Sequence, residues 1–243
     1  PMNNSVRKEI PMLELKNINF SADGKHILKD ISLSLDSGKF IAITGPNGSG
    51  KSTLAKVIMG IEKPDSGQIL FKGQDITNYS IDERARMGIS FGFQQPVRFK
   101  GITVHDLLNL ASRKKLSSNE ACEILSTVGL CANSYVDREV NSSLSGGELK
   151  RIEIASVMMR GSNLTIFDEP EAGIDLWSFN NLIKVFNNMR ASLEGSIIVI
   201  SHQERILNIA DEIVLLADGR VERVIPHGEP LESFINMQAC RKL

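Results

Sequence analysis

Residues 45–53, with the sequence GPNGSGKST, constrain this chain more than any other segment. They lie between an apolar run at 40–44 and a helix-forming run at 54–59. Glycines let the backbone fold around phosphate groups with its N–H groups pointing inward, and the following helix adds its positive dipole end. Lys51 can reach the β- and γ-phosphates, and the Ser52 hydroxyl can bind Mg²⁺. We therefore expect a nucleotide to be bound by Gly45, Pro46, Asn47, Gly48, Ser49, Gly50, Lys51, Ser52 and Thr53.

Length and composition favour a compact globular protein. With 243 residues, 42% of them hydrophobic, the chain can bury a substantial core. A net charge of −1 gives no reason to expect nucleic acid or an anionic membrane surface as a direct partner. No apolar stretch reaches the roughly 18 residues needed to span a bilayer. Three cysteines without a paired motif favour free thiols in a reducing, cytoplasmic compartment. We expect residues 1–10 to form a tail in which Pro1 is a cloning remnant before Met2.

Strand and helix signals predict an α/β fold. Residues 12–35 are predicted to form an antiparallel hairpin around a turn at 22–25, and residues 64–67 a second turn. Further strands are predicted at 40–44, 68–72, 89–94, 164–167, 197–201 and 213–217. Helical periodicity from 103 to 160 predicts helices beginning at 103, 118 and 147. We expect one domain over 11–243: a P-loop NTPase core (11–93 and 161–243), with an antiparallel β subdomain and an inserted helical subdomain (about 94–160).

Two adjacent carboxylates end the apolar strand at 164–167. ATP hydrolysis needs one carboxylate that holds Mg²⁺, usually through water, and another that orients or deprotonates the attacking water. We assign Asp168 to the metal and Glu169 to the water. A strand that ends in Asp-Glu is weak evidence alone, but it is specific downstream of a P-loop.

A second anion cradle is predicted where Leu144-Ser145-Gly146-Gly147-Glu148 precedes a helix. This segment resembles the LSGGQ signature of the ATP-binding cassette (ABC) family. Gln94 matches the Q-loop glutamine of that family, Asp175 its D-loop aspartate and His202 its switch histidine. The motifs occur in register over residues 12–225.

This resemblance implies an ABC-type fold and Mg²⁺-dependent ATP hydrolysis. It also implies a head-to-tail, ATP-dependent homodimer in which Ser145 and Gly147 of one subunit close on ATP held by Lys51 of the other. Gln94 would join Ser52 and Asp168 at Mg²⁺, Asp175 would line the ATP site, and His202 would contact the γ-phosphate. The aromatic residue on which the family often stacks adenine is replaced by Ala22, unless Phe20 or an apolar residue substitutes.

Three segments are similar to the SufC family, the ATPases of iron–sulfur cluster assembly. These are Phe93-Gln94-Gln95-Pro96-Val97, Gly147-Glu148-Leu149-Lys150-Arg151 and Ser201-His202-Gln203-Glu204-Arg205-Ile206-Leu207. That resemblance implies a soluble SufB/SufD-like scaffold protein as partner, with no direct membrane insertion. Glu171-Ala172 and Ile152 depart from the SufC pattern. The alternative is the nucleotide-binding ATPase subunit of an ABC membrane transporter.

Overall fold

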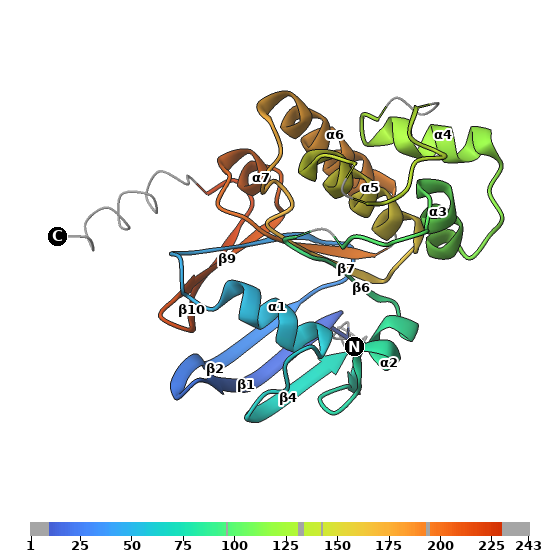
Figure 1. Ribbon diagram of the computed structural model, residues 1–243. Coiled ribbons are helices and arrows are strands. Elements are labelled where there is room, and N and C mark those ends of the chain that lie inside the picture. Colours follow the sequence, from blue (N-terminus) through green and yellow to red (C-terminus); the bar gives the residue numbers. More distant parts are fainter. Residues whose placement is uncertain (1–9, 96, 131–133, 142, 193–194, 230–243) are drawn as a thin grey trace, which may run out of the picture.

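Two β-sheets with helices between and above them form the molecule (Figure 1). The computed structural model describes residues 10–95, 97–130, 134–141, 143–192 and 195–229. The antiparallel sheet has the strand order β2-β1-β4-β5. Its strands are β1 (Leu13–Ala22), β2 (Lys25–Leu35), β4 (Ser66–Phe71) and β5 (Gln74–Asp75).

The core sheet has the strand order β10-β9-β3-β8-β7-β6 and is parallel except at its β10 edge. Its strands are β3 (Phe40–Thr44), β6 (Ile89–Gly92), β7 (Leu164–Asp168), β8 (Ser196–Ile200), β9 (Glu212–Ala217) and β10 (Arg220–Pro226). The helices are α1 (Lys51–Met59), α2 (Ile81–Arg86), α3 (Val104–Ser112), α4 (Ser118–Thr127), α5 (Gly146–Met159), α6 (Leu176–Ser192) and α7 (Glu204–Asn208).

The predicted hairpin is confirmed, and its turn chemistry explains it. Asp23 and Gly24 both have positive φ, 51° and 72°. Two central residues of positive φ make the tight turn whose twist matches that of two antiparallel strands. In β1, Leu13 and Leu15 are buried while Lys16 is exposed, so one face of the sheet covers the core.

Side chains alternate between two hydrophobic clusters along the central strand β3. Phe40 and Ala42 pack with residues of α5 and α6, and Ile41 and Ile43 pack with α1 and the antiparallel sheet. The core sheet therefore has helices on both faces, with α1 held between the two sheets (Figure 1). A strand buried on both faces needs the nearly continuous apolar sequence that predicted it.

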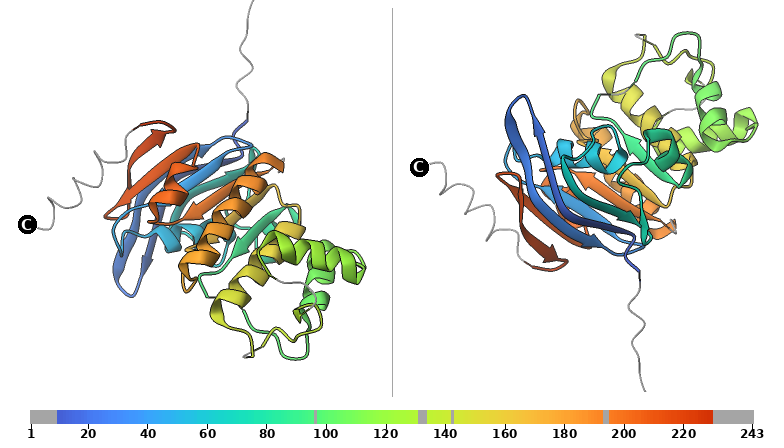
Figure 2. Two further views of the ribbon diagram at one scale, coloured as in Figure 1. Left: turned by 90° about the horizontal axis from the view of Figure 1, so that it is seen from above. Right: turned by 90° about the horizontal axis from the view of Figure 1, so that it is seen from below.

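Helices α3, α4 and α5 group at one corner of the molecule (Figure 2). They lie between β6 and β7 in the sequence. Each begins with a capping box, in which a Ser or Thr side chain accepts from the N3 backbone and an acidic N3 side chain accepts in return. The pairs are Thr103–Asp106, Ser117–Glu120 and Ser145–Glu148.

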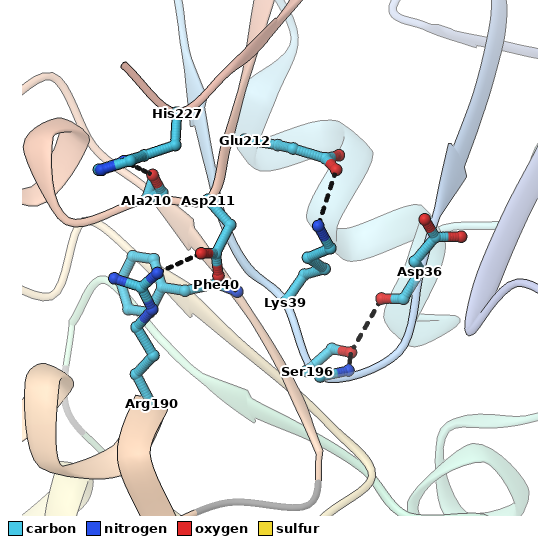
Figure 3. Close-up of polar contacts among 10 residues, drawn as sticks. Asp36, Lys39, Phe40, Arg190, Ser196, Ala210, Asp211, Glu212 and His227 are labelled. Atoms are coloured by element: carbon cyan, nitrogen blue, oxygen red, sulfur yellow. Dashed lines mark hydrogen bonds and ion pairs between the residues drawn. The ribbon is translucent and has the colours of Figure 1, made fainter.

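A polar network fixes the amino-terminal end of β3 (Figure 3). The Asp211 carboxylate accepts a 2.8 Å hydrogen bond from the Phe40 N–H and pairs with Arg190 of α6. Nearby, the Ser196 hydroxyl accepts from the Gly38 N–H (3.0 Å). These contacts tie β3 to its neighbours, and β3 leads directly into the P-loop at its other end.

Several predicted boundaries are wrong. Strand β6 ends at Gly92, so Gln94 lies two residues beyond it in the following loop. Strand β4 begins at Ser66, inside the predicted turn. Helix α2 and the edge strands β5 and β10 were not predicted, because they are short or mostly polar. Pro1, Met2, Pro96, Cys131 and Cys240 lie outside the described residues.

Candidate nucleotide-binding and catalytic site

The P-loop connects the carboxyl end of β3 to the first turn of α1. Gly45 has a φ of 146°, and a Cβ there would lie 1.9 Å from the Leu216 carbonyl oxygen, so only glycine fits. Gly50 caps α1 and makes no side-chain cap hydrogen bond. The first-turn N–H groups of α1 thus have no side-chain cap, unlike those of the capped helices, and can meet an anion.

Lys51 is the first residue of α1, directly after the loop, and is 7% exposed. Its Nζ donates to the carbonyl oxygens of Gly45 and Pro46, at 2.9 Å each. Burial lowers the pKa of Lys51, against the nearby charges of Glu169 and Asp168, which raise it. The Ser49 hydroxyl is buried and has no hydrogen-bond partner among the described residues. A buried cation beside an unsatisfied hydroxyl is chemically suited to phosphate oxygens.

Ser52 and Asp168 bring two oxygen donors together at the first turn of α1. The Ser52 hydroxyl donates a 3.0 Å hydrogen bond to Asp168 Oδ1, and Asp168 is almost fully buried at the end of β7. Burial raises the pKa of Asp168, while the bond from Ser52 lowers it. Hydroxyl and carboxylate oxygens are the ligands that Mg²⁺ prefers, so these residues fit that ion.

Glu169 and Gln94 meet beside this pair. Gln94 Nε2 donates to Glu169 Oε2 at 2.5 Å. Glu169 has a φ of 45°, in the left-handed region, and its N–H donates to the Ile200 carbonyl oxygen at 3.0 Å. A non-glycine residue held in this region stores backbone strain, which is characteristic of functional sites. Lys51, Ser52, Asp168, Glu169 and Gln94 therefore form one cluster.

Two side chains of α5 anchor the segment that carries Gln94. The Lys150 ammonium, 1% exposed, donates to the Phe93 carbonyl oxygen and forms a 3.1 Å ion pair with Glu153. Glu153 in turn accepts from the Phe93 N–H at 3.0 Å. Sequence reasoning missed this role of Lys150 and Glu153. Their i,i+3 spacing on α5 was the available signal, but it is equally typical of a solvent-exposed pair.

His202 follows β8 and is exposed. Its neighbour Ser201 is fully buried and donates a 2.5 Å hydrogen bond to Glu171 Oε1. Burial raises the pKa of Glu171, while the hydrogen bond from Ser201 lowers it. The charge of His202 also lowers this pKa, and that of Glu169 raises it. Glu171 was singled out from sequence only as a departure from a family pattern. Its buried Oε2 has no partner among the described residues.

The signature residues make their hydrogen bonds around the start of α5 and not with the P-loop. Ser145 and Gly146 are exposed, and Gly147 is half-buried at the start of α5. Ser145 bonds to Glu148, and the Gly147 carbonyl oxygen accepts from Arg151. Asp175 is exposed, and its carbonyl oxygen accepts from the Phe179 N–H at 2.9 Å. No hydrogen bond between described residues joins Ser145 or Gly147 to the P-loop.

The candidate base-binding residues differ in exposure. Phe20 is 7% exposed and belongs to the core between the two sheets, so its ring is not presented to solvent. The expectation that Phe20 could replace the missing aromatic residue is therefore wrong. Ala22 is half-buried at the end of β1.

Comparison with known proteins agrees with this architecture. The family model for the ABC transporter matches residues 28–172. An ABC transporter ATP-binding protein of Methanocaldococcus jannaschii is 40% identical over 231 residues, covering 92% of this chain and 91% of that protein. The protein of Antithamnion sp. named as a probable ATP-dependent transporter, ycf16, is 36% identical over 235 residues, covering 90% and 91%.

Solved structures show the same fold. The dimeric post-hydrolysis state of an ATP-binding cassette bound to ADP and Pi superposes with a TM-score of 0.78 at 25% identity, covering 88% of this chain and 98% of that one. The cbiO1 protein of Clostridium perfringens, part of the ABC transporter complex cbiONQ, superposes with a TM-score of 0.74 at 32% identity, covering 96% and 94%. The chain belongs to the ABC transporter family, has the ABC ATPase fold, and is an ATP hydrolase of that type. Within the described residues, no helix is both long and apolar enough to cross a bilayer.

Proposed function

We propose that the chain hydrolyses ATP when two copies close head to tail around two nucleotides. In this arrangement Lys51 and the P-loop amides bind the phosphates, Glu169 accepts the proton of the attacking water, and His202 contacts the γ-phosphate. Ser145 and Gly147 of the opposite subunit complete the site. Asp175 lines the same subunit boundary. Mg²⁺, held by Ser52, Gln94 and, through water, Asp168, would neutralise phosphate charge when bound.

One observation carries this proposal: the residues that match an ATP site fall into two groups, and no hydrogen bond between described residues joins Ser145 or Gly147 to the P-loop. Lys51, Asp168, Glu169 and Gln94 cluster at the P-loop, whereas Ser145 has its hydrogen bonds within the first turn of α5. A second subunit is the simplest source of the missing half. The solved cassette with ADP and Pi, which is similar in fold, is itself described as dimeric.

We further propose a SufC-like role in the cytoplasm. ATP-driven closure would reshape a soluble SufB/SufD-like scaffold protein, and the iron–sulfur cluster would be assembled on that partner. The sequence of residues 147–151 and 201–207 supports this role.

The partner would dock at the Q-loop. Phe93, Val97 and Phe99 are exposed to 41%, 47% and 36%, although they are apolar and close to the catalytic cluster. Buried anchors of this kind dominate protein interfaces. We expect Val97→Asp with Phe99→Asp to weaken scaffold binding at least about tenfold in calorimetry. Val224→Asp is the matched control, since Val224 is equally exposed but lies on β10, at the opposite edge of the core sheet from β6.

The second candidate is the ATPase subunit of a membrane transporter, which the names of the similar proteins favour. Cross-linking in cells followed by mass spectrometry separates the two roles. A soluble scaffold cross-linked near Val97 and Phe99 supports the SufC-like role. A multi-span permease at the same residues contradicts it and supports the transporter role.

A further inference from the structure

The signature segment contains an ionised carboxylate where the opposite subunit's ATP would have to approach. Glu148 is residue N3 of α5, and its Oε2 accepts a 2.6 Å hydrogen bond from the Ser145 N–H. Its Oε1 accepts a 2.5 Å hydrogen bond from the Tyr135 hydroxyl. Two donors therefore fix the carboxylate directly beside the Ser145 and Gly147 groups.

The positive charge of Arg138 acts on the Glu148 carboxylate and lowers its pKa, but less than the hydrogen bond from Tyr135 does. No ion pair among the described residues includes Glu148. Arg138 lies 5.1 Å from the centre of the Tyr135 ring and donates to the Ser143 carbonyl oxygen, while Arg151 donates to backbone carbonyls. The hydrogen bonds from Tyr135 and Ser145 keep the pKa of Glu148 below its usual range, so it stays ionised at neutral pH.

We propose that Glu148 opposes ATP-driven closure of the dimer by placing a negative charge against the triphosphate bound to the other subunit. This inference rests on the head-to-tail dimer of the proposed function. Like charges a few ångströms apart repel appreciably at a partly buried surface. Each dimer contains the contact twice, so the repulsion weakens closure of the isolated chain, and binding of the partner protein would offset it.

A Gln at this position would remove the charge and keep the local structure. Glu and Gln serve equally well as N3 residues of a capping box, because both present an oxygen to the N-cap N–H. Glu148 accepts from Tyr135 and Ser145 with different oxygens, and a Gln has only one. Its amide oxygen would accept from the Ser145 N–H while its NH2 donates to the Tyr135 hydroxyl, which can also act as an acceptor. Glu148→Gln therefore isolates the charge, and Glu148→Asp keeps it.

Helix α4 offers a matched control. Glu120 is the N3 residue of an identical capping box, accepting from the Ser117 N–H at 2.7 Å, and it lies outside the signature segment. Glu120→Gln changes net charge and helix capping in the same way as Glu148→Gln. Any effect of lost charge or altered capping in general will appear in both variants.

The test measures dimer dissociation constants by sedimentation with Mg-ATP. All variants carry Glu169→Gln, so that ATP persists during the run. We expect Glu148→Gln to tighten the dimer at least about tenfold at about 50 mM KCl, and the difference to shrink at about 500 mM, where the Debye length is several-fold shorter. Glu148→Asp and Glu120→Gln should match the parent, and ATP affinity of the monomer should be the same in all.

An equal dissociation constant for Glu148→Gln and the parent overturns the inference, as does a difference that salt does not change. A parent that dimerises with ATP while Glu148→Gln has no effect leaves the proposed function standing and removes only the role of Glu148. A parent that fails to dimerise while Glu148→Gln succeeds supports the inference. Failure of both to dimerise overturns the dimer and the inference together.

Discussion

Gln94 donates a 2.5 Å hydrogen bond to Glu169, a residue 75 positions away in the sequence. The backbone next to Gln94 is held in turn by Lys150 and Glu153 of α5, through the carbonyl oxygen and the N–H of Phe93. The helix that begins with the signature segment therefore sets the position of the carboxylate proposed to activate water in the same subunit.

Removing this anchor should slow catalysis with little effect on ATP binding. We expect Lys150→Met to lower kcat about tenfold or more while the KM for ATP changes little, because misplacement of catalytic groups by about 1 Å is costly. If Lys150 acts through Glu169, Lys150→Met should have almost no further effect in a Glu169→Gln background. Steady-state and single-turnover ATPase assays measure both. Arg160→Met, an exposed cation at the end of the same helix, is the control.

A loss of rate by the same factor in both backgrounds would contradict the positioning role. So would a fall in kcat that tracks a fall in thermal stability, since that pattern indicates general damage to the fold.

Arg84 should be essential for stability and not for catalysis. Its guanidinium is 1% exposed and donates to the carbonyl oxygens of Val57 and Ile58, in the last turn of α1, at 2.8 and 2.7 Å. We expect Arg84→Met to lower the free energy of unfolding by about 3 kcal/mol or more, because several buried carbonyls lose their donor at roughly 1–3 kcal/mol each. Urea unfolding measures this. Arg86→Met, which breaks an exposed pair with Asp82, should leave stability nearly unchanged.

The effect of replacing Glu171 on the free energy of unfolding should depend on pH, with a sign set by the raised pKa of this residue. Burial raises its pKa in the folded chain, so stability from its protonated form is lost as the pH rises through that value. The unfolding free energy of Glu171→Gln relative to the natural chain should therefore increase from about pH 4 to about pH 8. The pKa of Glu120 is lowered by its bonds to Ser117, so Glu120→Gln should show the opposite trend. Parallel pH trends for the two variants would contradict this account of Glu171.

Much of the core was predictable because its physical signals are local. Strands β3 and β8 are continuous apolar runs, and the hairpin turn has the Asp-Gly sequence that positive φ favours. The P-loop and the Asp168-Glu169 pair follow such strands directly. The sequence could therefore predict that the phosphate-binding loop and the two carboxylates lie at the same edge of the core sheet.

The remaining features depend on tertiary contacts that no local pattern encodes. Helix α2 is short, and its value to the fold lies in Arg84, a charged residue that would ordinarily be expected at the surface. The anchoring of Gln94 joins residues about sixty positions apart. Phe20 could be excluded as a base-stacking residue only once its burial was seen.

The central claim is that each ATP site is completed by a second chain, and mixing two inactive variants tests it most directly. Lys51→Ala removes the phosphate-binding cation from one group of residues, and Ser145→Arg blocks the signature in the other. Each variant alone should be inactive, because both of its sites carry a defect. A mixed dimer contains one site with intact Lys51 from one chain and intact Ser145 from the other.

We therefore predict that mixing the two purified variants restores ATP hydrolysis well above the sum of their separate rates, and that the restored rate falls on dilution. Both variants must first be shown to be folded by circular dichroism. Hydrolysis at the natural rate by Ser145→Arg alone, or no recovery in a mixture that forms dimers with ATP, would contradict a site shared between two chains.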